Sequence, residues 1–155
     1  MSGTDLDLIS RLEQQERELV LTSFDQRAAY VLGSAIAGRA LDAGLAVLID
    51  IRRPNLVLFR AALPGSTTDQ ELWAGRKAAT MFRMGASSAL VAARMSPDEI
   101  GPGAIGWLGP DYAITGGSFP IRVEGVGVVA AVTASGLTSE EDHDLVVEGL
   151  RAMVA

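Results

Sequence analysis

The stretch from Gly116 to Gly136, GGSFPIRVEGVGVVAAVTASG, constrains the fold more than any other part of the chain. It contains a Gly-Gly turn, a short strand over 119–124, a tight turn at Glu124-Gly125 and an apolar strand over 126–134. The second strand has small residues where Val or Ile would be usual: Gly127, Ala130, Ala131 and Ala134. Small side chains in a strand indicate that another element packs very close to it. We therefore predict a hairpin in the middle of an antiparallel sheet, with helices laid against it.

Five helices are predicted from apolar residues at helical spacing and from capping residues at the helix starts. They are an amphipathic helix over 5–17, a long helix capped by Ser23 and Gln26 and ended by Gly44, a helix over 69–84 behind a Thr68/Glu71 capping box, a short helix over 87–95, and a last helix behind a Thr138/Glu141 capping box. The first helix is expected to act as a lid or as an arm that docks on a neighbour.

Two further apolar segments, over 46–51 and 56–63, predict a second hairpin whose faces are both covered. Short strands are expected over 111–114 and, at an edge, over 19–21; the Gly- and Pro-rich segment 101–110 predicts a loop. The order of elements predicts an α+β domain with a five-stranded, mainly antiparallel sheet flanked by helices. At 155 residues the chain has the length of one domain, and we expect a helical arm with a short strand over 1–22 and a single domain over 23–155.

The composition excludes several classes of function. Hydrophobic residues make up 48% of the chain, which is rich for a soluble monomer and predicts a homo-oligomer in which other copies cover part of the apolar surface. No apolar run is long enough to span a membrane, and the acidic N-terminus does not look like a signal peptide, so we expect a cytoplasmic protein. The absence of cysteine excludes disulfides and thiolate-ligated metals. A net charge of -6 with no basic stripe argues against nucleic acid as a partner.

The helix over 69–84 carries the first candidate site. Trp73, Lys77, Thr80, Met81 and Met84 share one stripe, and Arg76 and Arg83 lie beside it. Two interpretations remain open for these cations. Either Lys77 extends to solvent while the arginines pair with surface acids, or the group binds the carboxylate or phosphate of a small anionic ligand.

The second candidate is His143, the single histidine, on the inward face of the last helix with Asp142 on its flank. It is either a hydrogen-bonded structural residue or a proton shuttle or axial ligand to a metal-bearing cofactor. One histidine without cysteine cannot build a zinc site, so no metal site is predicted. Gly116, Gly117 and Ser118 form either a simple turn or a backbone nest for an anion. General acid–base catalysis by Asp142 and His143 is a further alternative, without an evident nucleophile.

Several short motifs, in order along most of the chain, give it a resemblance to the haem-degrading, HbpS-like superfamily. They are Leu63-Pro64-Gly65, Trp73 with Arg76-Lys77, Ser87-Ser88, GGSFPI over 116–121, Ser135-Gly136-Leu137, and Asp142-His143. The resemblance implies a profilin-like α/β fold, assembly into dimers or larger rings, and binding of haem or corrinoid-related ligands. The branch that this chain resembles often has His before the GGSFPI turn, where this chain has Thr115. Haem ligation would then fall to His143 or a Met.

These observations give two hypotheses of different classes. The first is an oligomeric protein that binds a small ligand, with haem or a related tetrapyrrole as the cofactor that the resemblance suggests. Its predicted ligand-binding residues are Trp73, Arg76, Lys77, Gly116, Gly117, Ser118, Ser135, Asp142 and His143. The second is a non-catalytic, oligomeric protein-interaction module without a ligand, in which the same residues serve folding and subunit contacts.

Overall fold

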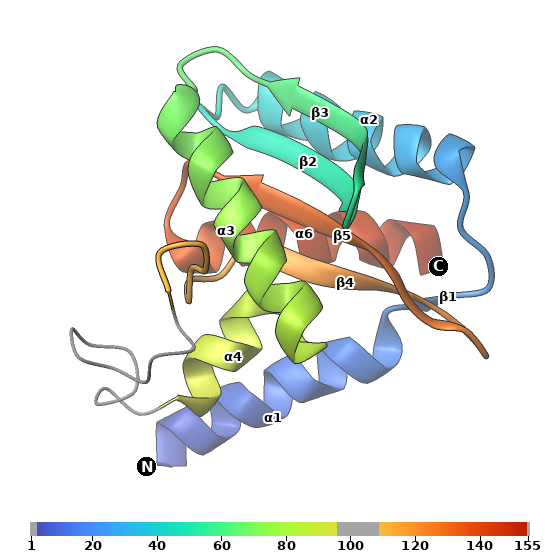
Figure 1. Ribbon diagram of the computed structural model, residues 1–155, viewed down its shortest axis with the longest axis vertical. Helices are drawn as coiled ribbons and strands as arrows, with labels where there is room; N and C mark the ends of the chain where they lie inside the picture. Colours follow the sequence, from blue (N-terminus) through green and yellow to red (C-terminus); the bar gives the residue numbers. More distant parts are fainter. Residues whose placement is uncertain (1–2, 96–108, 155) are drawn as a thin grey trace.

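The computed structural model describes residues 3–95 and 109–154 (Figure 1). Its elements are α1 (Gly3–Glu18), β1 (Val20–Leu21), α2 (Gln26–Asp42), β2 (Leu48–Arg53), β3 (Leu56–Ala62), α3 (Thr68–Met84), α4 (Ser88–Arg94), β4 (Ser118–Val123), β5 (Gly127–Ser135) and α6 (Ser139–Val154). None of the helices in this described part is long and apolar enough to cross a membrane. The cytoplasmic location stays a prediction.

The five strands form one sheet in the order β1-β4-β5-β2-β3, with β5 in the middle. β5 pairs antiparallel with β4 and β2, β2 pairs antiparallel with β3, and β1 pairs parallel with β4. The predicted α+β class, the presence of a five-stranded sheet and the central hairpin are confirmed. The sheet is mixed because the two-residue strand β1 runs parallel to its neighbour.

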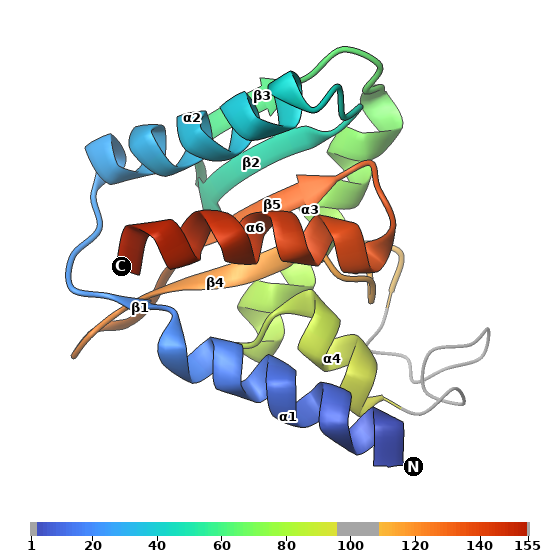
Figure 2. The same cartoon turned by 180° about the vertical axis from the view of Figure 1, so that it is seen from behind.

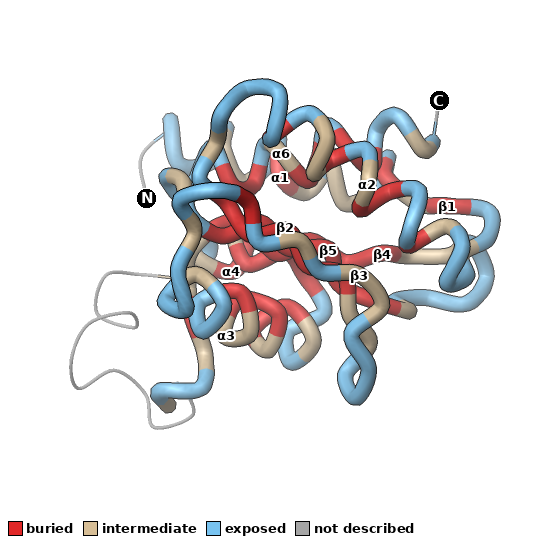
Figure 3. Tube along the Cα trace, turned by 90° about the horizontal axis from the view of Figure 1, so that it is seen from above, coloured by how far each residue is buried: buried red, intermediate tan, exposed pale blue. Residues whose placement is uncertain are grey.

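Helices cover both faces of the sheet (Figures 1 and 2). α2 and α6 lie on one face and α3 on the other, while α1 packs on α4 beside β4. The view from above shows the buried residues along the sheet and on the inward faces of the helices (Figure 3). The main core fills the space under α2 and α6, and a smaller cluster lies under α3.

The small residues of β5 let both helical layers approach the sheet closely. Ala130 and Ala134 belong to the core under α2 and α6, whereas Ala131 contacts Ala78 and Met81 of α3. The prediction of close packing is confirmed for these alanines. Gly127 differs, because no atom lies within 4 Å of where its Cβ would be and its φ is +105°. That glycine is needed for backbone conformation and not for space.

Two of the three predicted capping boxes are wrong by one or two positions. α2 is capped by Asp25, whose side chain accepts the Ala28 N–H at 2.8 Å, and α3 is capped by Thr67 with Gln70. In each case two residues with good capping side chains lie within two positions of one another, and sequence alone does not rank them. The Thr138/Glu141 box of α6 is confirmed, since the Glu141 N–H donates to Thr138 Oγ1 at 3.2 Å.

Two strand predictions are also wrong. Residues 111–114 form no strand, because the Ala113 backbone is bound to α3: its N–H reaches Thr80 Oγ1 at 3.1 Å, and its carbonyl accepts from that hydroxyl at 2.8 Å. β1, predicted as an additional edge strand, supplies the fifth strand.

The second wrong prediction concerns β3, which is not covered on both faces. It is the outermost strand and leaves Leu56 and Val57 half exposed. Apart from 109 and 110, the predicted loop over 101–110 lies outside the described residues.

Candidate ligand-binding site

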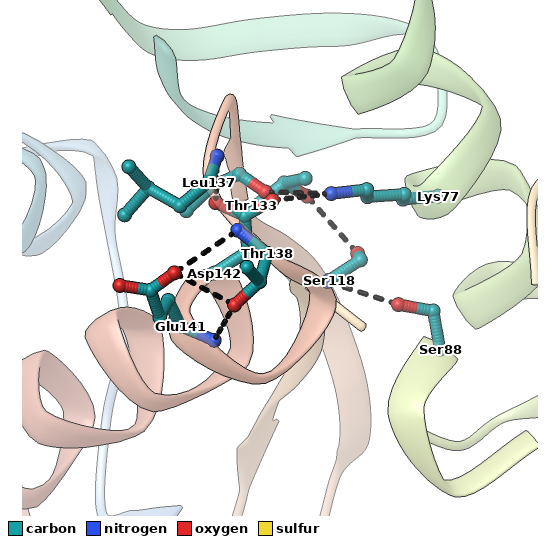
Figure 4. Close-up of polar contacts among 9 residues, drawn as sticks. Lys77, Ser88, Ser118, Thr133, Leu137, Thr138, Glu141 and Asp142 are labelled. Atoms are coloured by element: carbon teal, nitrogen blue, oxygen red, sulfur yellow. Dashed lines mark hydrogen bonds and ion pairs between the residues drawn. The ribbon is translucent and has the colours of Figure 1, made fainter. Parts of the chain in front are cut away.

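A buried ion pair joins the two helical layers at the end of the sheet. Lys77 of α3, only 4% exposed, places Nζ 2.7 Å from Asp142 Oδ2 of α6 and donates to the Ala134 carbonyl at 3.2 Å (Figure 4). Because α3 and α6 lie on opposite faces of the sheet, the pair ties them together around the end of β5. The interpretation that Lys77 extends to solvent is therefore wrong.

The Gly116-Gly117 turn makes room for this pair. A Cβ on Gly117 would lie 2.8 Å from Lys77 Nζ and 2.5 Å from the Ala134 carbonyl oxygen, and Gly117 has φ +140°. A side chain at this position would therefore both strain the backbone and displace the ammonium group. The next N–H in the turn, that of Ser118, donates to Ser88 Oγ at 3.1 Å. The turn thus packs against its neighbours and does not present the Ser118 N–H to an anion.

Asp142 is 1% exposed and is held from two sides. Its Oδ2 faces Lys77, and its Oδ1 accepts the Leu137 N–H at 3.0 Å. Burial raises the pKa of the Asp142 carboxyl above its ordinary value, although the Lys77 charge and the hydrogen bonds oppose this. The removal of either partner would leave a buried group without its counter-charge.

Lys77 and Asp142 form part of the wall of a small polar cavity of about 270 Å³. The lining residues come from the first half of α3, the end of β5, the start of α6 and the loop before β4: Asp69, Gln70, Trp73, Lys77, Thr115, Ser135, Gly136, Leu137, Ser139 and Asp142. We call this the smaller cavity. The charged side chains in its wall are one cation and two carboxylates.

His143 follows Asp142 directly but faces another part of the molecule. The residue is 4% exposed, its ring centre lies 5.9 Å from that of Phe119, and its Nε2 lies 2.7 Å from Gln15 Oε1 of α1. Because Gln15 Oε1 can only accept, Nε2 carries the proton. The Nδ1 atom is buried and has no hydrogen-bond partner within residues 3–95 and 109–154.

Burial, and to a smaller extent the nearby positive charge of Arg11, lowers the pKa of His143 from 6.5 to about 4. The imidazole is therefore neutral at pH 7. A neutral imidazole has a lone pair that can bind a metal or accept a hydrogen bond. The prediction that His143 points inward is confirmed, and its partner Gln15 was missed.

A larger cavity of about 580 Å³ lies beside His143, between α1, α4 and the start of α6. Among the described residues, its lining combines seven apolar or glycine residues with nine polar or charged ones, among them one arginine and three carboxylates: Thr4, Asp7, Leu8, Arg11, Leu12, Gln15, Ala89, Ala92, Ala93, Ile114, Thr115, Gly116, Ser139, Glu140, His143 and Asp144. Thr115 and Ser139 line both cavities. Lys77 and His143 therefore stand beside two neighbouring cavities that share a wall.

The helix α1 closes one side of the larger cavity and is anchored there by its polar residues. Glu16 accepts the Ser87 N–H at 3.0 Å and pairs with Arg122 at 2.8 Å. Leu12 is buried in a small core with Leu90 and Val91 of α4. Sequence reasoning assigned no ligand-binding residue to α1. The signal was there in the inward stripe of that helix, since Gln15 lies three residues after Leu12.

The nine predicted site residues do not form one pocket. Trp73, Lys77, Ser135 and Asp142 line the smaller cavity, and Gly116 and His143 line the larger one. Gly117, Ser118 and Arg76 line neither. The Arg76 guanidinium lies 5.5 Å from the centre of the Trp73 ring, a cation–π contact. Asp142 and His143 line different cavities and have different partners, so their placement gives no support to paired acid–base catalysis.

Comparison with known proteins decides the family. The family model described as haem degrading protein HbpS-like matches residues 24–151. The chain belongs to this HbpS-like family. It is 45% identical over 147 residues to a UPF0303 protein of Streptomyces coelicolor, covering 94% of this chain and 93% of that one. It is 41% identical over 149 residues to a UPF0303 protein of Rhizobium etli, covering 96% and 91%.

Several solved structures share the fold of this chain. The crystal structure of the Ybr137w protein has a TM-score of 0.82 and 31% identity to this chain, and covers 94% of this chain and 87% of its own. HbpS has a TM-score of 0.68 at 20% identity, covering 85% and 91%. A PduOC:heme complex has a TM-score of 0.62 at 19% identity, covering 98% and 94%. At these identities, the last two show a shared fold.

Proposed function

We propose that this protein binds haem or a related tetrapyrrole in the larger cavity. The observation that carries the proposal is His143, a buried, neutral imidazole in the cavity wall whose Nδ1 atom has no partner among the described residues. A buried polar atom without a partner is rare in proteins and calls for an explanation such as a ligand or an ion.

The other lining residues fit such a ligand. The cavity volume of about 580 Å³ lies within the usual range for cofactor sites, and Leu8, Leu12 and Ile114 give it apolar surface for a macrocycle. The exposed Arg11 is the one cation among the described residues of this lining, beside the carboxylates of Asp7, Glu140 and Asp144, and it would pair with a ligand carboxylate. His143 would supply the nitrogen ligand to an iron ion, and Gln15, bonded to its Nε2, orients the ring. Bound haem would supply an iron centre for ligation or redox chemistry.

The comparisons support this proposal at the level of the family. The matching family model is described as a haem-degrading protein, and one neighbour of the same fold was solved as a haem complex. Thr115, which replaces the histidine frequent in the branch that the chain resembles, lines both cavities. The replacement removes a second imidazole from the shared wall, so His143 remains as the single histidine of the chain.

The test is a titration of the protein with haemin followed by its Soret absorption. We expect a saturable shift at equimolar haemin, and binding at least about tenfold weaker in His143→Ala, equivalent to about 1.4 kcal/mol. Arg11→Ala should weaken binding, whereas Arg17→Ala, an exposed arginine on the same helix that lines neither cavity, should not. No shift at equimolar haemin would rule out the proposal, and so would equal affinity of the wild type and His143→Ala.

A second candidate function, an oligomeric interaction module without a ligand, is favoured by the outer edge of the sheet. β3 is an edge strand of seven residues, and Leu56 and Val57 on it are 50% and 43% exposed. Open strand edges with exposed apolar residues favour pairing with another chain. We propose that copies of the chain associate through this edge. Light scattering after size exclusion should show a smaller assembly for Val57→Lys than for the wild type and for the control Val154→Lys on α6.

A further inference from the structure

We propose that the smaller cavity is a second binding site, which takes a small, uncharged, polyhydroxylated molecule. The proposal goes beyond tetrapyrrole binding, because it concerns a different cavity and other side chains. It depends on unused hydrogen-bonding groups in the cavity wall, on the balance of charge there, and on the exposed ring of Trp73.

The first observation is Ser135, the last residue of β5, which is 2% exposed and lines the smaller cavity. Its hydroxyl forms no hydrogen bond with any residue of 3–95 or 109–154. Next to it, the Lys77 ammonium has three N–H groups and two acceptors, Asp142 and the Ala134 carbonyl. One N–H of Lys77 and the Ser135 hydroxyl are thus left for a ligand in the same wall.

The second observation is the charge of the cavity. The positive charge of Lys77 is balanced by Asp142 at 2.7 Å, and the exposed Asp69 adds a further negative charge to the lining. An anionic ligand would meet a wall with a net charge of about -1 and a cation already paired. We therefore replace the interpretation of Lys77 as an anion site. A hydroxyl group suits this wall better, because it both donates and accepts hydrogen bonds.

The third observation is the arrangement of α3 along the cavity. Asp69, Trp73 and Lys77 are spaced four residues apart and so follow one another on the same side of the helix. Trp73 is 38% exposed and offers both an apolar ring and an indole N–H donor. A hydroxylated carbon chain presents C–H groups to such a ring and hydroxyls to the polar groups around it. At about 270 Å³ the cavity has room for roughly nine waters, enough for a small polyol.

The experiment compares two probes that share a four-carbon chain with hydroxyls, erythritol and tartrate. The readout is the indole N–H signal of Trp73 in ¹H–¹⁵N spectra, assigned with Trp73→Phe, during titration of the full-length protein with each probe. We expect erythritol to shift this signal in a saturable way and tartrate to shift it at least about tenfold more weakly. The Ser135→Ala variant should bind erythritol several-fold more weakly, while Ser34→Ala on α2, a matched change outside both cavities, should bind it like the wild type.

Tighter binding of tartrate than of erythritol would overturn the proposal in favour of an anion site. Absence of any saturable shift with erythritol, or equal affinity in Ser135→Ala and the wild type, would also overturn it. Spectra of Ser135→Ala without ligand show whether the variant keeps its fold. Haemin titration of the same samples reports on the larger cavity separately, so that either proposal can fail while the other stands.

Discussion

The burial of His143 predicts a specific dependence of stability on pH. Its pKa is lowered from 6.5 to about 4 in the folded protein, so between these values the unfolded chain binds a proton that the folded chain does not. The stabilisation from the neutral imidazole is complete above about pH 6.5 and is lost as the pH falls to about 4. At 1.36 kcal/mol per pKa unit, the loss is about 3 kcal/mol.

The comparison of wild type with His143→Gln isolates this effect, because the chain contains no other histidine. The free energy of unfolding is measured by urea denaturation at intervals from pH 7 to pH 4. The two proteins can differ in free energy of unfolding already at pH 7. The comparison therefore uses the decrease in each protein's free energy of unfolding from pH 7 to pH 4, and asks how much larger that decrease is in the wild type. We expect that additional loss to be about 3 kcal/mol, since carboxylate titration is common to both proteins. Parallel curves would refute the reasoning, as would an imidazole NMR titration with a midpoint near 6.5.

Three further predictions concern the contacts around the two cavities. Lys77→Ala should lower the free energy of unfolding by about 3–5 kcal/mol, because it leaves Asp142 buried and unpaired. The double change Lys77→Met with Asp142→Leu should lower it clearly less, because no buried charge remains. Equal losses for the two variants in urea denaturation would contradict the importance of the pair. Gly117→Ala should cost at least about 2 kcal/mol from its positive φ and the crowding at Lys77, and a melting temperature like that of the wild type would be inconsistent with this. Glu16→Gln should speed hydrogen exchange in α1 with little change in β5; unchanged exchange would show that the Arg122 pair does not anchor the helix.

The sequence was informative wherever local pattern decides structure. The alanine positions of 126–134 predicted the close packing of the central strand, because small side chains in a strand indicate that neighbouring elements come near. The inward direction of His143 followed from helical periodicity alone. Both features depend on residues close together in the chain.

What could not be predicted depends on contacts between distant residues. Lys77 and Asp142 are 65 positions apart, and a lysine in an apolar stripe gives no sign of the acid that will neutralise it. The exposure of β3 follows from its place at the sheet edge, which its apolar sequence hides. For the same reason, local pattern could not predict that the candidate residues divide between two cavities, which share Thr115 and Ser139 in their walls.

The most direct test of the central claim is to map where a tetrapyrrole binds. Gallium protoporphyrin IX, a diamagnetic substitute for haemin, can be titrated into ¹⁵N-labelled protein and followed by NMR. We predict that the largest shifts fall on the His143 ring and on backbone amides of α1 and α4 around the larger cavity. Shifts confined to β3 and the outer surface of α2, with the His143 signals unchanged, would contradict the claim.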